Sequence, residues 1–232
     1  MPTRVNSLAV LAKAPVAGAV KTRLVPPLTS AQAAELYRAL LLDQFSHLRN
    51  FHGAERYVFY APADGENQVR DLAGADYAYL AQSDGDLGVR MHQVFTGLTD
   101  HLGHRNIVLI GADVPALPLP ILDQAFASLA GAEPRVVLGP SRDGGYYLLG
   151  MNRPTPDIFA GMSWSHERVL ADTTTRLDAI GLTYGLLPTW FDIDRAEDFQ
   201  HMWTLAKTDS ARLLSRSLHC LKDLGFGPPS NE

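Results

Sequence analysis

The 232-residue sequence predicts an α/β protein built on one doubly wound, mostly parallel sheet. Three observations lead to this prediction. Short apolar runs alternate with longer segments of helical periodicity. The apolar runs are nearly continuous, as in NIVLIG at residues 106–111, which is typical of strands covered on both faces. The hydrophobic fraction, 46%, is enough for a substantial buried core.

The first half of the chain supplies most of the predicted sheet. Strands are expected at Ser7–Ala12, Arg56–Ala61, Tyr77–Ala81, Asn106–Gly111 and Arg135–Gly139. Helices are expected at Thr29–Leu48, Leu87–Leu102 and Leu119–Leu129. In the first helix Leu36, Leu40 and Phe45 share one face. Its N-cap is predicted to be Thr29 or Ser30.

The alternation of predicted strands and helices changes after residue 140. The apolar segment GGYYLLGM at 144–151 follows a strand so closely that it predicts an antiparallel insertion near 140–151. The later elements expected are a helix at Ser165–Gly181, a strand at Leu182–Pro188, and helices at Ala196–Lys207 and Asp209–Leu224. Ser163 or Ser165 is predicted to cap the first of these helices. With no repeat or linker, residues 1–225 are expected to form a single domain and 226–232 a flexible tail.

Charge and cysteine content exclude several classes of function. The net charge of −5 gives no overall attraction to nucleic acid or to an anionic membrane, so any polyanion must be bound by a local cationic cluster. The single cysteine, Cys220, excludes an internal disulfide and a CxxC metal site, and is predicted to be a packing residue. The sequence shows no membrane-spanning run and no secretory signal, so a cytoplasmic location is expected.

In an open α/β sheet, ligands bind beyond the carboxyl ends of the strands, so the loops there are the first candidates for chemistry. The first such loop lies in LAVLAKAPVAGAVKTRL, residues 8–24. It contributes Lys13, Gly18, Lys21, Thr22 and Arg23. A Walker loop requires glycine directly before the Lys-Thr pair, whereas Val20 stands here. The loop is therefore predicted to be a different phosphate-binding cradle, with a solvated basic turn as the alternative.

Three aspartates from distant segments are candidate ligands for a metal ion. Asp113 follows a buried strand in the segment IGADVPALP, where a carboxylate offers the core nothing. Asp192 and Asp194 alternate around Ile193, so in an extended segment both point to the same side. Mg²⁺ or Mn²⁺ prefers carboxylates together with substrate phosphates. The alternative for both Asp113 and Asp194 is that each caps a following helix.

Two further loops supply candidate contacts to the substrates. The segment QSDGDLGVRM contributes Gln82, Asp86, Gly88 and Arg90 as candidate nucleotide-binding residues. A tight turn followed by an N-cap explains this segment equally well. The segment PSRDGGYYLLG contributes Asp143, Gly144, Gly145 and Tyr146 as candidate acceptor-binding residues, with an ordinary turn as the alternative. Trp164, Trp190 and Trp203 are predicted to lie in the core or in a pocket wall.

These segments together resemble the GT-A-like nucleotide-diphospho-sugar transferases. The resemblance is carried by AKAPVAGAVKTRL, GDLGVRM, IGADVPALP, GPSRDGGYYLLG, WSHERVL and WFDIDRAEDF, and it spans roughly residues 7 to 206. Within that superfamily the sequence is most similar to the bacterial selenodomain-associated or arsenosugar-biosynthesis glycosyltransferase-like proteins. Through KTRL it also resembles the phospholactate guanylyltransferases. The resemblance implies a GT-A-like, Rossmann-like fold with a nucleotide bound above the N-terminal half of the sheet.

The resemblance also implies roles for individual residues. Lys21 and Arg23 would contact phosphates and act in catalysis together with Asp113, which would bind the metal. Asp194 would complete the metal shell, with Asp192 as a substitute. The sequence departs from the family pattern at Arg195, where relatives commonly carry a small hydroxyl residue, and at Ala17, where many carry proline.

Two transfer reactions fit this pattern. The first is glycosyl transfer from a nucleotide-diphospho-sugar to a small-molecule acceptor, which the family context favours. The alternative is nucleotidyl transfer from a nucleoside triphosphate with release of pyrophosphate, which the single aspartate of GADVP and the KTRL segment favour. A non-catalytic nucleotide-binding protein is the third interpretation. Neither nucleic acid nor a membrane is expected as a partner, and a homodimer is compatible with the sequence.

Overall fold

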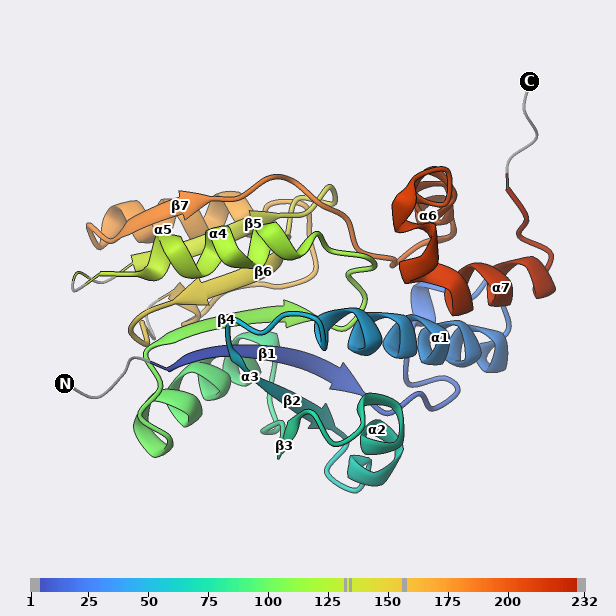
Figure 1. The fold of residues 1–232 in the computed structure, drawn as a ribbon. Helices are drawn as coiled ribbons and strands as arrows, with labels where there is room; N and C mark the ends of the chain where they lie inside the picture. Colours follow the sequence, from blue (N-terminus) through green and yellow to red (C-terminus); the bar gives the residue numbers. More distant parts are fainter. Residues whose placement is uncertain (1–4, 132, 134, 156–157, 229–232) are drawn as a thin grey trace.

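The computed structural model describes residues 5–131, 133, 135–155 and 158–228, and its core is one seven-stranded sheet with helices on both faces (Figure 1). The strand order is β3-β2-β1-β4-β6-β5-β7. Strand β6 runs antiparallel to its neighbours β4 and β5, whereas the other paired strands are parallel. The predicted doubly wound, mostly parallel sheet is confirmed, and so is the antiparallel insertion.

The strands lie close to their predicted ranges. They are β1 (Asn6–Lys13), β2 (Glu55–Ala61), β3 (Ala78–Ala81), β4 (Asn106–Gly111), β5 (Arg135–Pro140), β6 (Tyr146–Met151) and β7 (Thr183–Leu186). In β1 the side chains of Leu8 and Val10 enter the hydrophobic cluster on one face of the sheet, and Ala9 enters the cluster on the other. This burial on both faces explains why the strand sequences read as continuous apolar runs.

Five helices cover the two faces of the sheet. Helices α1 (Ser30–Leu48), α2 (Glu66–Ala73) and α4 (Leu119–Leu129) contribute buried side chains to one cluster. Helices α3 (Leu87–Thr96) and α5 (Val169–Ala179) contribute to the opposite cluster. Thr29 begins α1 with the predicted cap, because its hydroxyl accepts a hydrogen bond from the Gln32 amide and the Gln32 side chain accepts one from the Thr29 amide.

The last two helices, α6 (Phe199–Leu205) and α7 (Ser215–Asp223), pack beside α1 in a third cluster (Figure 1). The buried carboxylate of Asp43 in α1 anchors α7. It accepts hydrogen bonds from the Ser217 amide at 2.8 Å and the Ser217 hydroxyl at 2.7 Å, and it forms an ion pair with Arg216 at 3.2 Å. A carboxylate at a helix N-terminus satisfies free amides there, which fixes α7 against α1.

Several helix boundaries differ from the predictions. Helix α5 begins at Val169 rather than near Ser165, because Ser165 adopts a left-handed φ of 67° and no side chain caps the helix. The predicted Ser163 or Ser165 cap is therefore wrong. Helix α2 was not predicted, since its sequence ENQVRDLA buries only Val69, Leu72 and Ala73.

Three predicted helices contain a change of helical type. A π-helical turn at Gly97–His101 follows α3. Helix α6 is preceded by a 3-10 turn at Ala196–Asp198, and α7 by a 3-10 segment at Asp209–Leu214. Each predicted helix was continuous, so these boundaries are corrections. Periodicity alone does not separate the helical types, because their side-chain spacings differ by less than one residue per turn.

The C-terminal segment is partly attached. At the start of the predicted tail, Phe226 packs edge-on against Phe199 and its carbonyl accepts a hydrogen bond from the Trp203 indole. Residues 229–232 of the predicted tail lie outside the described residues. In the described part of the chain, no helix has both the length and the apolar character that crossing a membrane requires.

Candidate functional site

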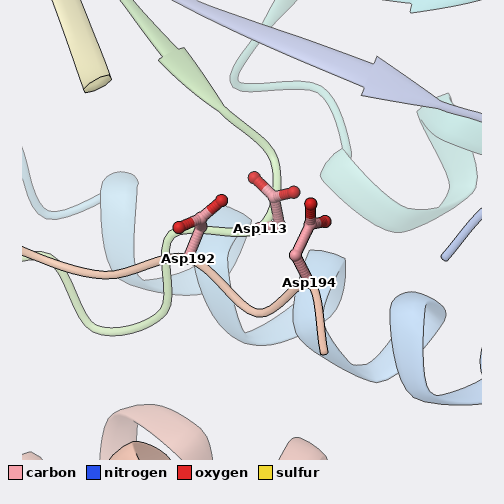
Figure 2. A group of neighbouring side chains, drawn as sticks. All are labelled: Asp113, Asp192 and Asp194. Atoms are coloured by element: carbon pink, nitrogen blue, oxygen red, sulfur yellow. The ribbon is translucent and has the colours of Figure 1, made fainter. Parts of the chain in front are cut away.

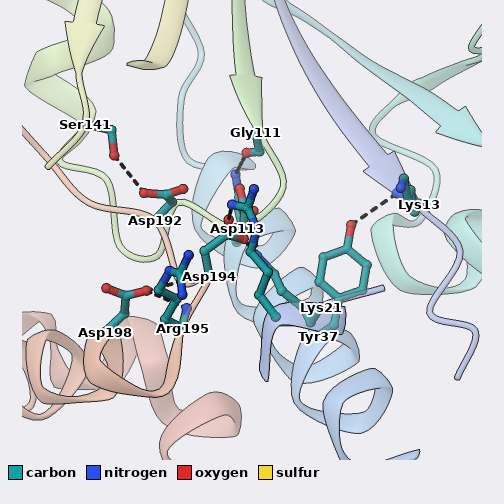
Figure 3. Close-up of polar contacts among 12 residues, drawn as sticks. Lys13, Lys21, Tyr37, Gly111, Asp113, Ser141, Asp192, Asp194, Arg195 and Asp198 are labelled. Atoms are coloured by element: carbon teal, nitrogen blue, oxygen red, sulfur yellow. Dashed lines mark hydrogen bonds and ion pairs between the residues drawn. The ribbon is translucent and has the colours of Figure 1, made fainter. Parts of the chain in front are cut away.

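The first loop and Asp113 meet because β1 and β4 are parallel neighbours. Leu11 is the register partner of Gly111, so the chain leaves both strands at the same edge. Lys21 then adopts a left-handed conformation, with φ of 48°, just before a 3-10 turn at Thr22–Leu24. Its Nζ atom lies 2.6 Å from Asp113 Oδ2 and 3.0 Å from Asp194 Oδ1, and its side chain is only 5% exposed. Lys21 therefore bridges two of the candidate metal ligands directly (Figure 3).

The segment carrying Asp192 and Asp194 is fixed by backbone contacts to the loop after β4. The Ile193 amide donates to the Asp113 carbonyl at 3.1 Å. The Trp190 indole donates to the carbonyl of Pro115 at 3.0 Å. The Asp194 carboxylate also pairs with Arg23 at 2.7 Å. Two segments far apart in the sequence are thus held side by side at the carboxyl edge of the sheet.

The carboxylates of Asp113, Asp192 and Asp194 converge (Figure 2). One oxygen from each lies within 4.8 Å of the others, and each side chain is partly buried. Three hard oxygen donors from two loops fit the preference of Mg²⁺ or Mn²⁺. The helix-cap alternatives are wrong, because α4 has no side-chain cap and the amides of residues 194 and 195 bond instead to Asp198.

The electrostatics of the cluster differ from one carboxylate to the next. Burial alone would lower the pKa of Lys21, but the charges of Asp113 and Asp194 raise it above its ordinary value, so Lys21 is charged. Burial tends to raise the pKa of Asp194, yet Lys21 and Arg23 outweigh it and lower that pKa. For Asp192, burial and then the charge of Asp113 raise the pKa to about 7, against a hydrogen bond from Ser141.

These opposite shifts predict opposite effects on stability when each carboxylate is replaced by an amide. The raised pKa of Asp192 means that its contribution to stability is full below about pH 4 and is lost as the pH rises through 7. Asp192→Asn removes that loss. Without metal, the free energy of unfolding of the variant, relative to that of the wild type, should therefore increase by about 1 to 3 kcal/mol from pH 5 to pH 8. Urea unfolding in EDTA at both pH values measures the gain.

Asp194→Asn is the matched comparison for that experiment. Its carboxylate has a lowered pKa, so its stabilisation is complete above about pH 4 and is lost only as the pH falls below that value. The variant should therefore be less stable than wild type at pH 5 and at pH 8, by a similar amount. Equal responses of the two variants to pH would show that Asp192 and Asp194 do not differ in protonation.

A cavity of about 580 Å³ opens beside the ion-pair cluster. Among the predicted residues it is lined by Lys13, Lys21, Thr22, Arg23, Gln82, Arg90, Asp113 and Asp194. The Gln82 amide donates to the carbonyls of Ala12 and Phe59, and its oxygen accepts from Arg90 at 3.1 Å. The strand ends thus hold Gln82, and Gln82 in turn orients Arg90 along the cavity.

The other predicted nucleotide-binding residues do not line this cavity. Asp86 caps α3, accepting a hydrogen bond from the Val89 amide at 2.9 Å. Gly88 lies against the ring of Trp164, since a Cβ there would come within 2.7 Å of the indole. Gly18 has a φ of 79°, a conformation that glycine adopts at little cost. Arg195, the departure from the family pattern, is exposed and lines neither this cavity nor the smaller one beside it.

The smaller cavity, of about 160 Å³, is lined by three of the four predicted acceptor-binding residues, Asp143, Gly145 and Tyr146. Asp192 also lines it, and Ser141 donates a hydrogen bond to Asp192 at 2.7 Å. The fourth predicted residue, Gly144, instead lies against protein backbone. It has a φ of 88°, and a Cβ at this position would lie 1.9 Å from the Glu167 carbonyl oxygen.

Gly144→Ala should therefore destabilise the protein. The substitution combines an unfavourable φ with a collision against backbone that cannot rotate away, and we expect a loss of about 2 to 4 kcal/mol in urea unfolding. Gly161→Ala is the matched control, because Gly161 also has a positive φ, 61°, but no atom within 4 Å of the added Cβ. It should lose about 1 kcal/mol. Equal losses would contradict the close approach of Glu167.

Other cavity-lining residues were not predicted as site residues. Those with polar side chains are Tyr37, Ser141, Ser165 and His166. Trp164 was predicted only as a core or pocket residue, and it lines the smaller cavity. Ser141 carries a signal in the sequence, because it directly precedes the Arg-Asp-Gly-Gly turn. Tyr37 carries none, since its position matches the buried face of α1.

A bacterial protein family described as "Uncharacterized protein conserved in bacteria (DUF2064)" matches residues 44–166. This match covers more than half of the 232 residues. The chain belongs to the DUF2064 family. The matched region contains Asp113 and the candidate acceptor-binding residues 143–146. It does not contain Lys21, Arg23, Asp192 or Asp194.

Solved structures extend the comparison of this DUF2064 protein beyond the matched region. A protein from Desulfovibrio desulfuricans G20, provisionally named a nucleotide-diphospho-sugar transferase, is 27% identical, with a TM-score of 0.82 over 97% of this chain and 99% of that one. A cytidylyltransferase from Leptospira borgpetersenii serovar Hardjo-bovis (strain JB197) is 12% identical, with a TM-score of 0.59 over 99% of both chains. A 4-diphosphocytidyl-2C-methyl-D-erythritol synthase is 12% identical, with a TM-score of 0.55 over 85% of this chain and 96% of that one.

No curated protein matches the chain significantly. The cytidylyltransferase and the synthase show the shared fold alone. The Desulfovibrio protein is also 27% identical in sequence along almost its whole length. The 27% identity over almost the whole of both chains supports placing this chain in the nucleotide-diphospho-sugar transferase-like superfamily.

Proposed function

We propose that this DUF2064 protein is a divalent-metal-dependent glycosyltransferase that moves a sugar from a nucleotide-diphospho-sugar to a small-molecule acceptor. The observation that carries the proposal is the cluster in which Asp113, Asp192 and Asp194 converge beside Lys21 and Arg23. Carboxylates that hold a metal, next to cations that bind phosphate, are what the departure of a nucleoside diphosphate requires. Within the superfamily, the sequence motifs favour the selenodomain-associated or arsenosugar-type subgroup.

The three aspartates would hold Mg²⁺ or Mn²⁺, which would neutralise charge on the phosphate oxygens when bound. Lys21 and Arg23 line the larger cavity and would hold the diphosphate as its negative charge increases during transfer. The acceptor hydroxyl oxygen forms the bond to the anomeric carbon, the bond from that carbon to the diphosphate oxygen breaks, and the hydroxyl proton is released. The 580 Å³ cavity, with Gln82 and Arg90 in its wall, would receive the nucleoside.

Nucleotidyl transfer is the second candidate, and one observation favours it. Asp113 is the only carboxylate in residues 106–118, whereas many glycosyltransferases of this fold carry an Asp-x-Asp pair there. In that reaction the acceptor oxygen attacks the α-phosphorus of a nucleoside triphosphate, and the bond to the departing pyrophosphate breaks. The phosphate-binding roles of Lys21 and Arg23 would be the same.

Isothermal titration calorimetry and product analysis separate the candidates. The protein is titrated with the common nucleoside triphosphates and nucleotide-diphospho-sugars in Mg²⁺ or Mn²⁺, and released phosphates are then measured. Release of a nucleoside diphosphate from a sugar donor supports glycosyl transfer, and pyrophosphate from a triphosphate supports nucleotidyl transfer. Tight nucleotide binding without either product, under all acceptors tested, would instead indicate a non-catalytic nucleotide-binding protein.

A further inference from the structure

The smaller cavity adjoins the larger one at the ion-pair cluster. Arg23, Leu87, Ser165 and Asp194 line both cavities. A molecule in the smaller cavity would therefore lie next to the phosphates of a nucleotide in the larger one. The chemistry of the smaller cavity then restricts the class of acceptor.

The charged side chains of the smaller cavity are mostly acidic. Asp143, Asp192 and Asp194 face a single arginine, Arg23, which is already paired with Asp194 at 2.7 Å. His166 adds no cation in its observed arrangement. Its Nδ1 accepts a hydrogen bond from the amide of residue 168, which leaves the proton on Nε2 facing the carbonyl of residue 163.

The arginine of this loop, Arg142, adds no charge to the cavity wall. Arg142 is exposed, lines neither cavity, and directs its guanidinium to His201 at 3.2 Å. Asp192 and Asp194 would hold the metal ion, which leaves Asp143 as the carboxylate of this cavity that no lining cation offsets. A phosphate or carboxylate group placed beside Asp143 would therefore meet a like charge. Such a juxtaposition weakens binding.

The remaining wall is aromatic and apolar. Tyr146, Trp164, Leu87 and Val169 supply it. Trp164 reaches this position because Gly88 has no side chain, and its ring is also in contact with Phe159. Flat rings opposite hydrogen-bond acceptors suit a molecule with an apolar ring face and hydroxyl groups at its edge.

We propose that the acceptor is a neutral, hydroxyl-rich ring compound, such as a monosaccharide unit, and not a phosphate ester or a carboxylic acid. This inference rests on the transferase function proposed above and names the substrate class for its second site. Hydroxyl groups would donate to Asp143 and Asp192, while the apolar face of the ring would lie against Trp164 and Tyr146. A neutral hydroxyl acceptor also favours glycosyl transfer over nucleotidyl transfer to a phosphorylated acceptor.

Matched pairs of small molecules test the charge preference. Glucose and glucose 6-phosphate, galactose and galactose 6-phosphate, and ribose and ribose 5-phosphate are titrated into the protein with Mg²⁺ and a saturating nucleoside diphosphate, which occupies the phosphate-binding residues of the larger cavity. Binding is followed by saturation-transfer NMR. The neutral member of at least one pair should bind at least about tenfold more tightly than its phosphate ester. Tighter or equal binding of every phosphate ester, or no binding of any neutral sugar, would overturn the proposal.

Asp143→Asn links the preference to this cavity. The amide oxygen of the new side chain can still accept the hydrogen bond from Gly145 that Asp143 accepts at 2.9 Å, so the turn is kept while one negative charge is lost. The preference for the neutral molecule should fall by about tenfold. Asp178→Asn, which changes an exposed carboxylate of α5 that lines neither cavity, should leave it unchanged. Identical behaviour of the two variants would also overturn the proposal.

Different measurements test the transferase function and the neutral acceptor. Nucleotide binding in the larger cavity is measured by calorimetry without any acceptor, so its absence counts against the transferase function alone. Nucleotide binding together with a preference for phosphate esters would leave the transferase function standing and overturn only the neutral-acceptor assignment.

Discussion

Replacing Asp113 with alanine is expected to lower metal-dependent turnover by about a thousandfold or more while the protein remains folded. Its carboxylate lies at the centre of the cluster, 2.6 Å from Lys21 and next to Asp192 and Asp194. The variant loses a metal ligand and leaves Lys21 paired only with Asp194. Initial rates of phosphate release across a range of Mg²⁺ and Mn²⁺ concentrations measure the loss.

Asp123→Ala is a suitable control for this experiment, because Asp123 is an exposed carboxylate on α4, a few residues along the chain. It should keep wild-type turnover. Both variants should retain the thermal transition of the wild type within a few degrees, which separates a lost site from a lost fold. Full turnover in Asp113→Ala would remove the metal assignment. Nucleotide binding that survives in this variant, with no turnover in the wild type, would support a non-catalytic role.

The fold could be predicted because its sheet is buried on both faces. Strand β4 and helix α4 begin and end at the predicted residues, since each is an apolar run with clear stop signals on both sides. Prediction was weakest where local conformation, rather than periodicity, decides. The left-handed conformation of Ser165 delays α5 to Val169, and no pattern in the sequence marks it.

The site could be predicted in composition but not in contacts. The alternation of Asp192 and Asp194 placed both carboxylates on one side of an extended segment, and the structure brings both to Asp113. The resemblance implied that Lys21 contacts a nucleotide's phosphates while these acids bind the metal. The structure instead pairs them directly, because the left-handed turn at Lys21 directs its side chain into the cluster. That turn depends on tertiary contacts, which one sequence does not reveal.

Loop glycines show the same limit. Gly88 and Gly144 were predicted to approach ligands, yet the space beside each is occupied by protein, the Trp164 ring in one case and the Glu167 backbone in the other. A glycine next to a ligand and a glycine next to packed protein have the same sequence signature, since both only require the absence of a Cβ. The delayed start of α5 had the further effect of freeing residues 164–166 to line the two cavities.

Replacing Lys21 with methionine is expected to lower turnover by about a hundredfold or more, yet to tighten the binding of metal alone by about tenfold. The loss of turnover follows from the missing cation at the phosphates. The gain in metal affinity follows from competition, because the buried ammonium occupies carboxylates of Asp113 and Asp194 that would hold the metal. Mn²⁺ titration followed by electron paramagnetic resonance measures the second effect without any turnover.

In the wild type, nucleotide and metal should then each increase the affinity for the other. Phosphates that draw Lys21 away leave the carboxylates of Asp113 and Asp194 free to bind the metal. By linkage, a nucleotide should raise Mn²⁺ affinity by the same factor by which Mn²⁺ raises nucleotide affinity. Lys21→Met should remove much of this coupling. Lys13→Met is the control for metal binding, because Lys13 is exposed and lines the cavity outside the aspartate cluster. In the absence of nucleotide, this variant should bind Mn²⁺ with the same affinity as the wild type. Weaker Mn²⁺ binding by Lys21→Met than by the wild type would mean that Lys21 holds the three aspartates in place rather than competing for them.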